Sequence, residues 1–319
     1  MRVFDAYGHV SLPRFLSASE YLKVMDENGV KMAMVCTAET CPDLGELSRA
    51  AVEHGERFRV AGLPLGDGPA EIEEGVAAQM DSGFIGVRIP DSLIAGRPGI
   101  LDVLGKAGGI PFVVGSGGFP SAAAALCGFL DKYPDALVCG PHFAGGGDPE
   151  ILSANRDVAR LFDHPRFAVI FSRHGAFERE RLLAWAMAVV ARVGWGRIMY
   201  GSEYPVALFR DETYASTVSW IDSSGLNPGL KEKEAFLGEN ARRLIFEKPV
   251  KKARPLDKRW CRMDLRREAP VWLFTGRTLD VPEDAHRKLL EAYLKQGGEK
   301  SGSYRDFVTR VLVKGIGIL

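Results

Sequence analysis

A short stretch near the start of the chain, "VFDAYGHVSLP", carries Asp5, Tyr7 and His9 at alternate positions. Alternate residues of a strand share one face, so these three side chains are expected to point the same way. An Asp-x-His-x-His run at a strand end would supply imidazoles to a metal ion, but the middle position here is Tyr7. The stretch is an altered metal site, a site converted to other chemistry, or a relic.

Three more residues with catalytic potential follow predicted strands later in the chain. His142 lies in "VCGPHFAGGG", His174 in "VIFSRHGAF" and Glu203 in "YGSEYP". The chain has only 6 histidines, so the gathering of His9, His142 and His174 at strand ends exceeds a random scatter. Imidazoles and a carboxylate that meet at the ends of neighbouring strands can hold a metal that activates water, or act as acid and base without one.

These residues also have structural interpretations. A histidine at a strand end is commonly a hydrogen-bonded structural residue, and Glu203 could be paired with a nearby arginine. Asp5 could hold the loop of the first strand, and Tyr7 could be a packed aromatic residue with its hydroxyl satisfied.

Two arginines and a glycine-rich loop suggest how a substrate would bind. Arg88 ends "FIGVRIP" and Arg173 precedes His174, so both lie at predicted strand ends. Arginine grips carboxylates in a bidentate fork, which favours a small anionic substrate. Ser116 lies in "VGSGGFP", whose glycines allow close approach to a substrate. The alternative is that either arginine pairs with Glu203 or another acid.

The elements that position these residues alternate between short apolar runs and longer amphipathic segments. Eight strands are expected, at residues 2–7, 31–36, 57–65, 84–90, 111–117, 136–141, 167–172 and 197–202. Strands alternating with helices indicate parallel βαβ units, and eight units close into a (β/α)8 TIM-like barrel with its active site at the carboxyl ends of the strands. An open doubly wound sheet is the other candidate, but no G-x-G-x-x-G loop follows the first strand.

The composition changes after the barrel, which is expected to occupy residues 1–247. Residues 248–267 contain nine Lys or Arg against only Asp257 and Asp264. A charge run of this kind indicates an exposed linker in the first place, a partner-binding arm in the second and a nucleic-acid-binding arm in the third. Two helices are expected to follow, the first starting at Pro282, to complete a C-terminal helical appendage over residues 248–319.

Global properties narrow the function classes. Net charge is zero at pH 7 and the pI is about 7.0, so nucleic acid is not expected as a partner. Pro111 and Pro120 interrupt the longest uncharged stretch, and no signal peptide precedes the first strand, so no membrane segment is expected. Five cysteines without a C-x-x-C pair favour reduced thiols and a cytoplasmic location.

The motifs "FDAYGH", "GVRIP", "PHFAGGG", "FSRHGAF", "RIMYGSEYP" and "LGENARRLIF" occur in an order that resembles the amidohydrolase-related family. That group includes aminocarboxymuconate-semialdehyde decarboxylase, resorcylate-type decarboxylases and several lactonases. The resemblance implies one divalent metal, most often zinc, held here by His9, His142 and Glu203. It also implies catalytic roles for Glu203, His174, His142 and Tyr7, and a homo-oligomer.

Two positions depart from the family pattern. Tyr7 stands for a histidine, and a neutral phenol is a poor metal ligand because it ionises only near pH 10. Glu203 stands for an aspartate and moves its carboxylate outward by roughly 1.3–1.5 Å. The two changes could compensate by holding a relocated metal or by a hydrogen bond between Glu203 and the Tyr7 hydroxyl. Some lactonases of the family resemble such a case and work without metal.

Two hypotheses follow. The first is an amidohydrolase-related hydrolase or decarboxylase acting on a small carboxylate-bearing substrate, with a divalent metal or without one. The second is a catalytically diverged barrel that serves as a subunit and binds a protein partner through residues 248–319.

Overall fold

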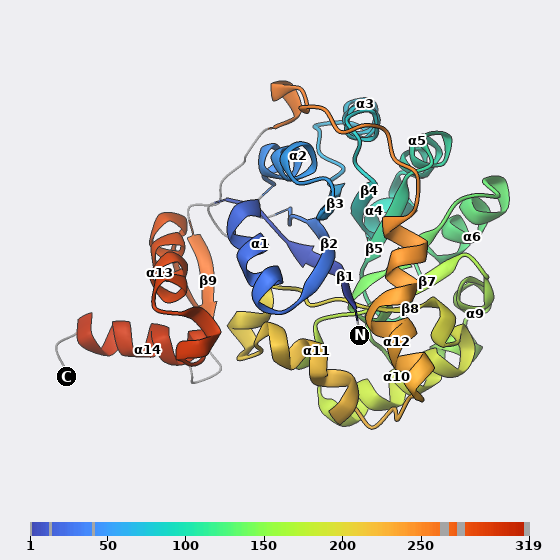
Figure 1. The fold of residues 1–319 in the computed structure, drawn as a ribbon. Helices are drawn as coiled ribbons and strands as arrows, with labels where there is room; N and C mark the ends of the chain where they lie inside the picture. Colours follow the sequence, from blue (N-terminus) through green and yellow to red (C-terminus); the bar gives the residue numbers. More distant parts are fainter. Residues whose placement is uncertain (1, 13–14, 40–41, 262–267, 273–277, 316–319) are drawn as a thin grey trace.

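A computed structural model describes residues 2–12, 15–39, 42–261, 268–272 and 278–315. Eight parallel strands follow one another in chain order around a nearly closed barrel, and helices cover its outside (Figure 1). The strands are β1 Val3–His9, β2 Val30–Cys36, β3 Phe58–Gly62, β4 Gly86–Pro90, β5 Ile110–Val114, β6 Val138–Gly140, β7 Phe167–Phe171 and β8 Ile198–Tyr200. The predicted (β/α)8 barrel is confirmed, and each predicted strand overlaps an observed one.

The connecting helices begin and end where local sequence signals place them. Ser17 caps the first helix by accepting from the backbone of Glu20, whose side chain accepts from the backbone of Ser17 in return. The helices of the barrel are α1 Ala18–Glu27, α2 Leu44–Glu53, α3 Pro69–Asp81, α4 Asp91–Gly96, α5 Gly99–Ala107, α6 Ala123–Lys132, α8 Ile151–Ala154, α9 Arg156–Asp163, α10 Arg179–Val193 and α11 Tyr214–Ser223. Short turns η1 His174–Ala176, η2 Trp195–Arg197 and η3 Val206–Arg210 lie among them.

Apolar side chains fill the barrel below its mouth. Phe4, Phe112 and Ile170 belong to one buried cluster built from the inward faces of the strands. Phe246 closes the opposite end, with its ring 5.5 Å from that of Phe4. It comes from a helical segment formed by α12 Leu230–Glu234, η4 Ala235–Glu239 and η5 Arg242–Phe246. Because one end is packed shut, side chains that do chemistry can gather only at the other.

The basic segment after the barrel is not the exposed linker that its charge predicts. It crosses the outside of α2 and α3 and ends in the turn η6 Lys258–Trp260 (Figure 1). Leu256 and Trp260 are buried there, 5% and 9% exposed, and the Leu256 amide donates to the Ser48 hydroxyl at 2.8 Å. The charged side chains face outward, and Arg259 pairs with Glu74 at 2.9 Å. Buried apolar side chains and polar contacts with Ser48, Glu74 and Asp81 together hold the segment on the barrel.

The C-terminal extension packs against its own barrel. It consists of a hairpin, β9 Glu268–Trp272 and β10 Thr278–Pro282, followed by α13 Glu283–Lys295, η7 Gly298–Ser301 and α14 Tyr304–Gly315. The two helices match the sequence prediction, whereas the hairpin was not predicted. His286 is fully buried on α13.

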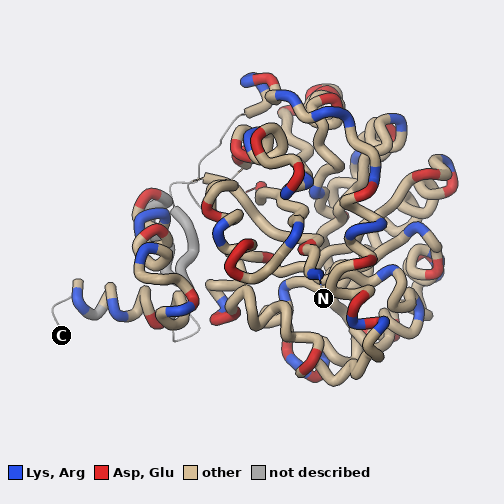
Figure 2. Tube along the Cα trace, viewed as in Figure 1, with Lys and Arg blue, Asp and Glu red and all other residues tan. Residues whose placement is uncertain are grey.

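Charge is distributed evenly over the molecule. Basic and acidic segments alternate along both the barrel and the extension (Figure 2). No helix among the described residues is both long enough and apolar enough to span a bilayer.

Candidate active site

The mouth of the barrel gathers residues from several strand ends. Tyr7 and His9 end β1, His142 follows β6, Arg173 follows β7 and Glu203 follows β8. Tyr7 is fully buried, and His9, His142 and Glu203 are 3%, 6% and 3% exposed. The Arg173 side chain is 46% exposed. The structure thus places five of the sequence-predicted residues at one rim, with Arg173 nearest to solvent.

Tyr7 and Glu203 are joined through their backbones. The Glu203 amide donates to the Tyr7 carbonyl at 2.8 Å, and the His9 amide donates to the Tyr204 carbonyl at 2.8 Å. These two bonds join β1 to the loop after β8 at the mouth. The bond suggested between Glu203 and the Tyr7 hydroxyl is not found among the described residues: that hydroxyl accepts from Nε of Arg88 at 2.9 Å and contacts the Cys36 thiol.

The Glu203 carboxylate lies among three positively polarised groups. Its Oε2 accepts from Nη2 of Arg210 at 2.5 Å, while Oε1 lies 3.1 Å from Nε2 of His142 and 4.0 Å from Nε of Arg173. Burial alone would raise the pKa of Glu203, but Arg210 and His142 outweigh it and hold the pKa well below its usual range. Glu203 is therefore a buried, ionised carboxylate at neutral pH.

Backbone strain is concentrated at the same residues. His142, Arg173 and Glu203 have φ angles of 56°, 67° and 53°, in the left-handed region that residues with a Cβ rarely adopt. Each such residue costs on the order of 1–3 kcal/mol. Strain of this kind clusters at functional sites. The backbone therefore marks this rim independently of the residue types that occupy it.

His142 lies in the short turn α7, Pro141–Ala144, whose residues His142, Phe143 and Ala144 have left-handed backbone conformations. The His142 amide donates to the Ser172 hydroxyl at 3.0 Å, and the Tyr7 ring meets the imidazole edge-on at 5.1 Å. Nε2 faces Glu203, but its approach is not aligned as a hydrogen bond. Burial lowers the pKa of His142 in spite of the Glu203 charge, so the ring is neutral at neutral pH.

His9 is packed rather than exposed to the mouth. Its Nδ1 lies 3.5 Å from Sγ of Cys36, and its ring packs on Phe15 with centroids 5.2 Å apart. Burial lowers the pKa of His9 to about 3 and raises the pKa of the Cys36 thiol to about 12. Both groups are neutral at neutral pH.

Arg88 has the structural role that was the alternative to substrate binding. Its Nε donates to the Tyr7 hydroxyl, and its Nη1 contacts both carboxylate oxygens of Glu39 at 2.6 Å. Burial alone would lower the pKa of Arg88, but Tyr7 and Glu39 raise it. Two of the donors that would grip a substrate carboxylate are therefore already engaged, and Arg173 is the better-placed cation.

His174 lies in an aromatic environment on η1. Its ring is 4.6 Å from that of Trp220 and meets the Phe143 ring edge-on at 5.5 Å. Neither ring nitrogen has a well-aligned hydrogen-bond partner among the described residues. Burial and the Arg210 charge lower the pKa of His174 to about 3. These contacts resemble those of a packing residue more than those of a proton carrier.

Asp5 is a structural anchor, as its alternative interpretation proposed. Its carboxylate accepts from the Tyr7 and Ser202 amides, each at 3.0 Å, and from the hydroxyls of Tyr21, Ser202 and Tyr214 at 3.1, 2.6 and 2.6 Å. The donors come from β1, α1, α11 and the loop after β8. Asp5 therefore fixes the junction between β1 and the loop after β8, which we call the seam of the barrel.

A family model described as amidohydrolase matches residues 2–246. The chain belongs to this amidohydrolase family. The match ends before the basic segment, so the C-terminal extension lies outside it. A comparison with proteins of curated function finds no match.

Solved structures resemble this chain over nearly their whole length. A dihydroxybenzoic acid decarboxylase from Polaromonas sp. JS666, with bound manganese and 2-nitroresorcinol, is 14% identical with a TM-score of 0.58, over 79% of this chain and 98% of its own. A probable 2-pyrone-4,6-dicarboxylic acid hydrolase from Acinetobacter baumannii, with bound citric acid, is 14% identical with a TM-score of 0.57, over 76% and 99%. An amidohydrolase from Burkholderia multivorans with bound zinc is 15% identical with a TM-score of 0.56, over 76% and 99%. At these identities the likeness establishes the fold.

The residues predicted to hold a metal, His9, His142 and Glu203, do not fit one as they are arranged. Among the described residues no three His, Cys, Asp or Glu side chains are grouped to hold an ion. The Arg210 guanidinium lies 2.5 Å from Glu203 and would repel a divalent cation at that carboxylate. Nδ1 of His9 faces Sγ of Cys36 at 3.5 Å, which leaves at most its Nε2 for a metal. The metal-ligand assignment stays a prediction, and no chemical step is derived through a metal.

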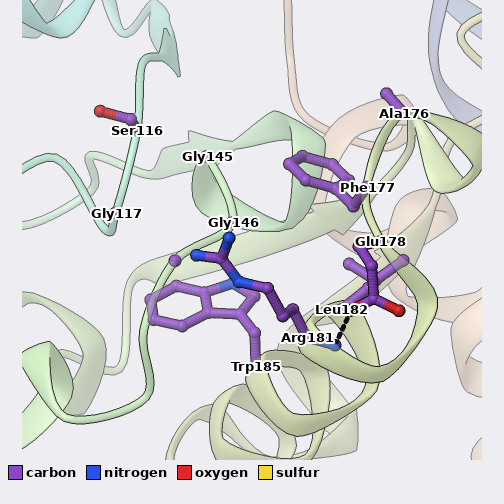
Figure 3. Close-up of a pocket in the computed structure, with 11 residues that line it drawn as sticks. Ser116, Gly117, Gly145, Gly146, Ala176, Phe177, Glu178, Arg181, Leu182 and Trp185 are labelled. Atoms are coloured by element: carbon purple, nitrogen blue, oxygen red, sulfur yellow. Dashed lines mark hydrogen bonds between the residues drawn. The ribbon is translucent and has the colours of Figure 1, made fainter.

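Ser116 lies away from these residues, in a pocket of about 480 Å³ beside the mouth (Figure 3). The pocket is bounded by the loops after β5, β6 and β7 and by α10. Its lining residues are Ser116, Gly117, Gly145, Gly146, Gly147, Ala176, Phe177, Glu178, Arg181, Leu182 and Trp185. None of the residues around the Glu203 carboxylate lines it, so Ser116 is not brought together with them.

Sequence analysis missed Arg210, the closest cation to Glu203. Its Nε also pairs with Glu212 at 2.9 Å, and its side chain is only 11% exposed. A signal was present, because Arg210 lies in the loop after the eighth strand, where barrels of this type carry functional residues. Glu203 therefore does pair with a nearby arginine, as its structural interpretation proposed, and that arginine is Arg210.

Proposed function

We propose that this amidohydrolase is a metal-independent hydrolase of esters or lactones that carry a carboxylate. The observation that supports it is the position of the Glu203 carboxylate, 3.1 Å from Nε2 of His142 and 2.5 Å from Nη2 of Arg210. A carboxylate beside a neutral imidazole orients the ring and stabilises the imidazolium that forms when the ring takes a proton.

In this proposal His142 is the general base. With Nε2 turned toward Glu203, Nδ1 is the nitrogen left to accept a proton from water. The water oxygen bonds to the ester carbonyl carbon, and the bond from that carbon to the leaving oxygen breaks. The proton held by His142 then passes to the leaving oxygen. One water is consumed, and an alcohol and a carboxylic acid are formed, the acid releasing its proton to solvent as it becomes a carboxylate.

Other residues of the mouth hold charges and positions. Arg210 supplies a fixed positive charge at Glu203, the carboxylate that the family resemblance assigns to the metal. Arg173 is the exposed cation near Glu203, and its guanidinium suits a carboxylate on the substrate. Tyr7 is a positioning residue, since its ring lies edge-on to both His9 and His142.

The protonation states favour hydrolysis over decarboxylation. The carbon that loses carbon dioxide must receive a proton, so a decarboxylase needs an acid. Burial lowers the pKa of His9, His142 and His174, which leaves all three imidazoles neutral at neutral pH. A neutral imidazole can act as a base but not as an acid.

The test is turnover under chelation. The protein is dialysed against EDTA and offered 2-pyrone-4,6-dicarboxylate, simpler carboxylated lactones and dihydroxybenzoates, with products followed by chromatography. We expect lactone opening at a rate within about twofold of the untreated protein and a loss of about 100-fold for His142→Gln. The matched control is His164→Gln, outside the mouth. Loss of turnover on chelation, or decarboxylation alone, would contradict the proposal.

A second candidate is a barrel without catalysis that serves as a subunit of a complex. The observation that favours it is the nearly complete burial of His9, His142 and His174, which are 3%, 6% and 4% exposed. It predicts no turnover of any compound in the panel and identical behaviour of the wild-type protein and His142→Gln.

A further inference from the structure

Contacts between the C-terminal extension and the barrel converge on the two loops that flank the candidate active site. Helix α13 lies beside α1, and α14 packs against η3 in the loop after β8 (Figure 1). These loops carry Phe15, which covers His9, and Arg210, which holds Glu203. The extension therefore contacts the seam that the backbones of Tyr7 and Glu203 close.

The first contact fixes the residue that covers His9. Nη1 of Arg287, on α13, donates to the Phe15 carbonyl at 2.8 Å. Nη2 of the same guanidinium contacts both carboxylate oxygens of Glu20, each at 2.8 Å. The Arg287 side chain is only 15% exposed, so this guanidinium is held between the loop and α1.

The second contact bears on the residue next to Arg210. Phe209, on η3, packs between the rings of His286 and Tyr304, with centroids 5.2 and 5.8 Å away. Phe209 is 7% exposed and Tyr304 2% exposed. Both aromatic rings that enclose Phe209 come from the extension. Because Phe209 and Arg210 are consecutive on one short turn, movement of the first displaces the second.

The third contact lies at the start of α11. Oε1 of Glu299, on η7, accepts from the Tyr214 amide at 2.5 Å. The Tyr214 hydroxyl donates to Asp5 at 2.6 Å. The extension thus also reaches the residue that ties α11 to the floor of the mouth.

We propose that Arg287 and Tyr304 are positioning residues of the active site, through which the extension keeps Phe15 on His9 and Arg210 on Glu203. The catalytic part of this inference rests on the proposed function. Its structural part is that the extension keeps residues 206–212 in a fixed conformation. The family match ends at residue 246, so this support is an addition to the barrel that the family shares. Arg210 reaches Glu203 from the turn η3, so the position of its guanidinium depends on support for that turn.

The experiment is hydrogen exchange on the full chain, read by mass spectrometry at peptides covering residues 203–213. The amides of Ala207, Leu208 and Glu212 report the turn, since they donate to Glu203, Pro205 and Ala207 at 3.1, 3.0 and 3.2 Å. We expect exchange about tenfold faster there for Tyr304→Ala, with β4 and β5 unchanged. The matched control is Tyr304→Phe, because that buried hydroxyl has no hydrogen-bond partner among the described residues.

A milder pair guards against misfolding of Tyr304→Ala. Arg287→Ala removes the bond to Phe15, while Lys288→Ala on the same helix changes a side chain that is 78% exposed. We expect faster exchange at residues 11–16 for the first and no change for the second. Exchange that rises only within α13 and α14 would overturn the inference.

The exchange result does not depend on turnover, so failure of the proposed function and failure of this inference are distinguishable. Where a substrate is turned over, Tyr304→Ala is expected to lower kcat about fivefold and leave KM within about twofold, because Arg173 is untouched. A loss in KM alone would contradict a role through Arg210.

Discussion

Nη2 of Arg210 lies 2.5 Å from Oε2 of Glu203, and both side chains are almost fully buried. The carboxylate that the family resemblance assigns to a metal is thus neutralised by an arginine seven residues further along the chain. Tyr7 and Glu203, the two departures from the family pattern, belong to this rebuilt arrangement. The Tyr7 ring lies edge-on to His142 and its hydroxyl accepts from Arg88, while Glu203 binds Arg210 through its carboxylate.

Removing the arginine tests the strength of this pair. Arg210→Met leaves Glu203 buried without its closest cation, so the free energy of unfolding is expected to fall by about 3–5 kcal/mol. Arg259→Met is the matched control, because its pair with Glu74 is about half exposed and such pairs contribute less than about 1 kcal/mol. Urea denaturation measures both. Equal losses for the two variants would show that the Arg210 pair has no special role.

Acid is expected to destabilise the protein through its buried histidines. The pKa values of His9 and His174 are lowered from 6.5 to about 3, so the unfolded chain takes up protons between these limits while the folded chain does not. The stability that these two histidines contribute is therefore full above pH 6.5 and falls below it, by about 1.4 kcal/mol per pH unit for each histidine. Burial raises the pKa of Glu299 to about 7, which opposes part of this loss. Glu203, whose pKa is lowered from 4.5, adds to the loss below that pH. Unfolding curves that do not change between neutral pH and pH 4.5 would contradict these shifts.

His174→Phe tests whether His174 is a packing residue. Phenylalanine keeps the contacts with Trp220 and Phe143 and removes two buried nitrogens that lack aligned partners. We expect the free energy of unfolding at neutral pH to rise by about 1 kcal/mol and turnover to stay within about threefold. The loss of stability per pH unit in acid should decrease by the contribution of one histidine. A stable variant without turnover would instead assign His174 the proton transfer that the family resemblance implies.

Asp5→Asn tests the anchor beneath the mouth. An asparagine amide cannot accept from all five donors that face Asp5, and the Tyr7 and Ser202 amides cannot reverse their roles. The free energy of unfolding is expected to fall by about 3 kcal/mol. Asp284→Asn, whose side chain is 74% exposed on α13, is the control and should change it by less than about 0.5 kcal/mol. A loss no larger than that of the control would mean that the donors find other partners.

The fold could be predicted because its signals are local. Apolar runs of strand length alternate with amphipathic segments, and each of the eight runs overlaps an observed strand. The cap at Ser17 was likewise readable, since Glu20 stands at the spacing of a capping box. Burial of Leu256 and Trp260 could not be predicted, because it depends on packing against Ser48 of α2 and Gly75 of α3, which sequence spacing does not reveal.

The site could be predicted only to the level of which strand ends carry it. His9, His142 and Glu203 lie at the rim because their strands end there. Which atoms face each other depends on left-handed backbone at His142 and Glu203 and on a loop that returns Arg210 to the mouth. The residue types at these positions indicate neither the left-handed backbone nor the path of the loop. The homo-oligomer and the cytoplasmic location stay predictions.

The metal content of the purified protein tests the account most directly. The full chain is purified without chelator, equilibrated with excess zinc or manganese, desalted and analysed by mass spectrometry for metal per chain. We expect well below one ion per chain for the wild-type protein, and an increase when Arg210→Met and Tyr7→His are combined, because the carboxylate is then free and an imidazole is restored. One ion per wild-type chain, lost in both Glu203→Gln and His142→Ala, would contradict the claim that Arg210 stands where the metal would be.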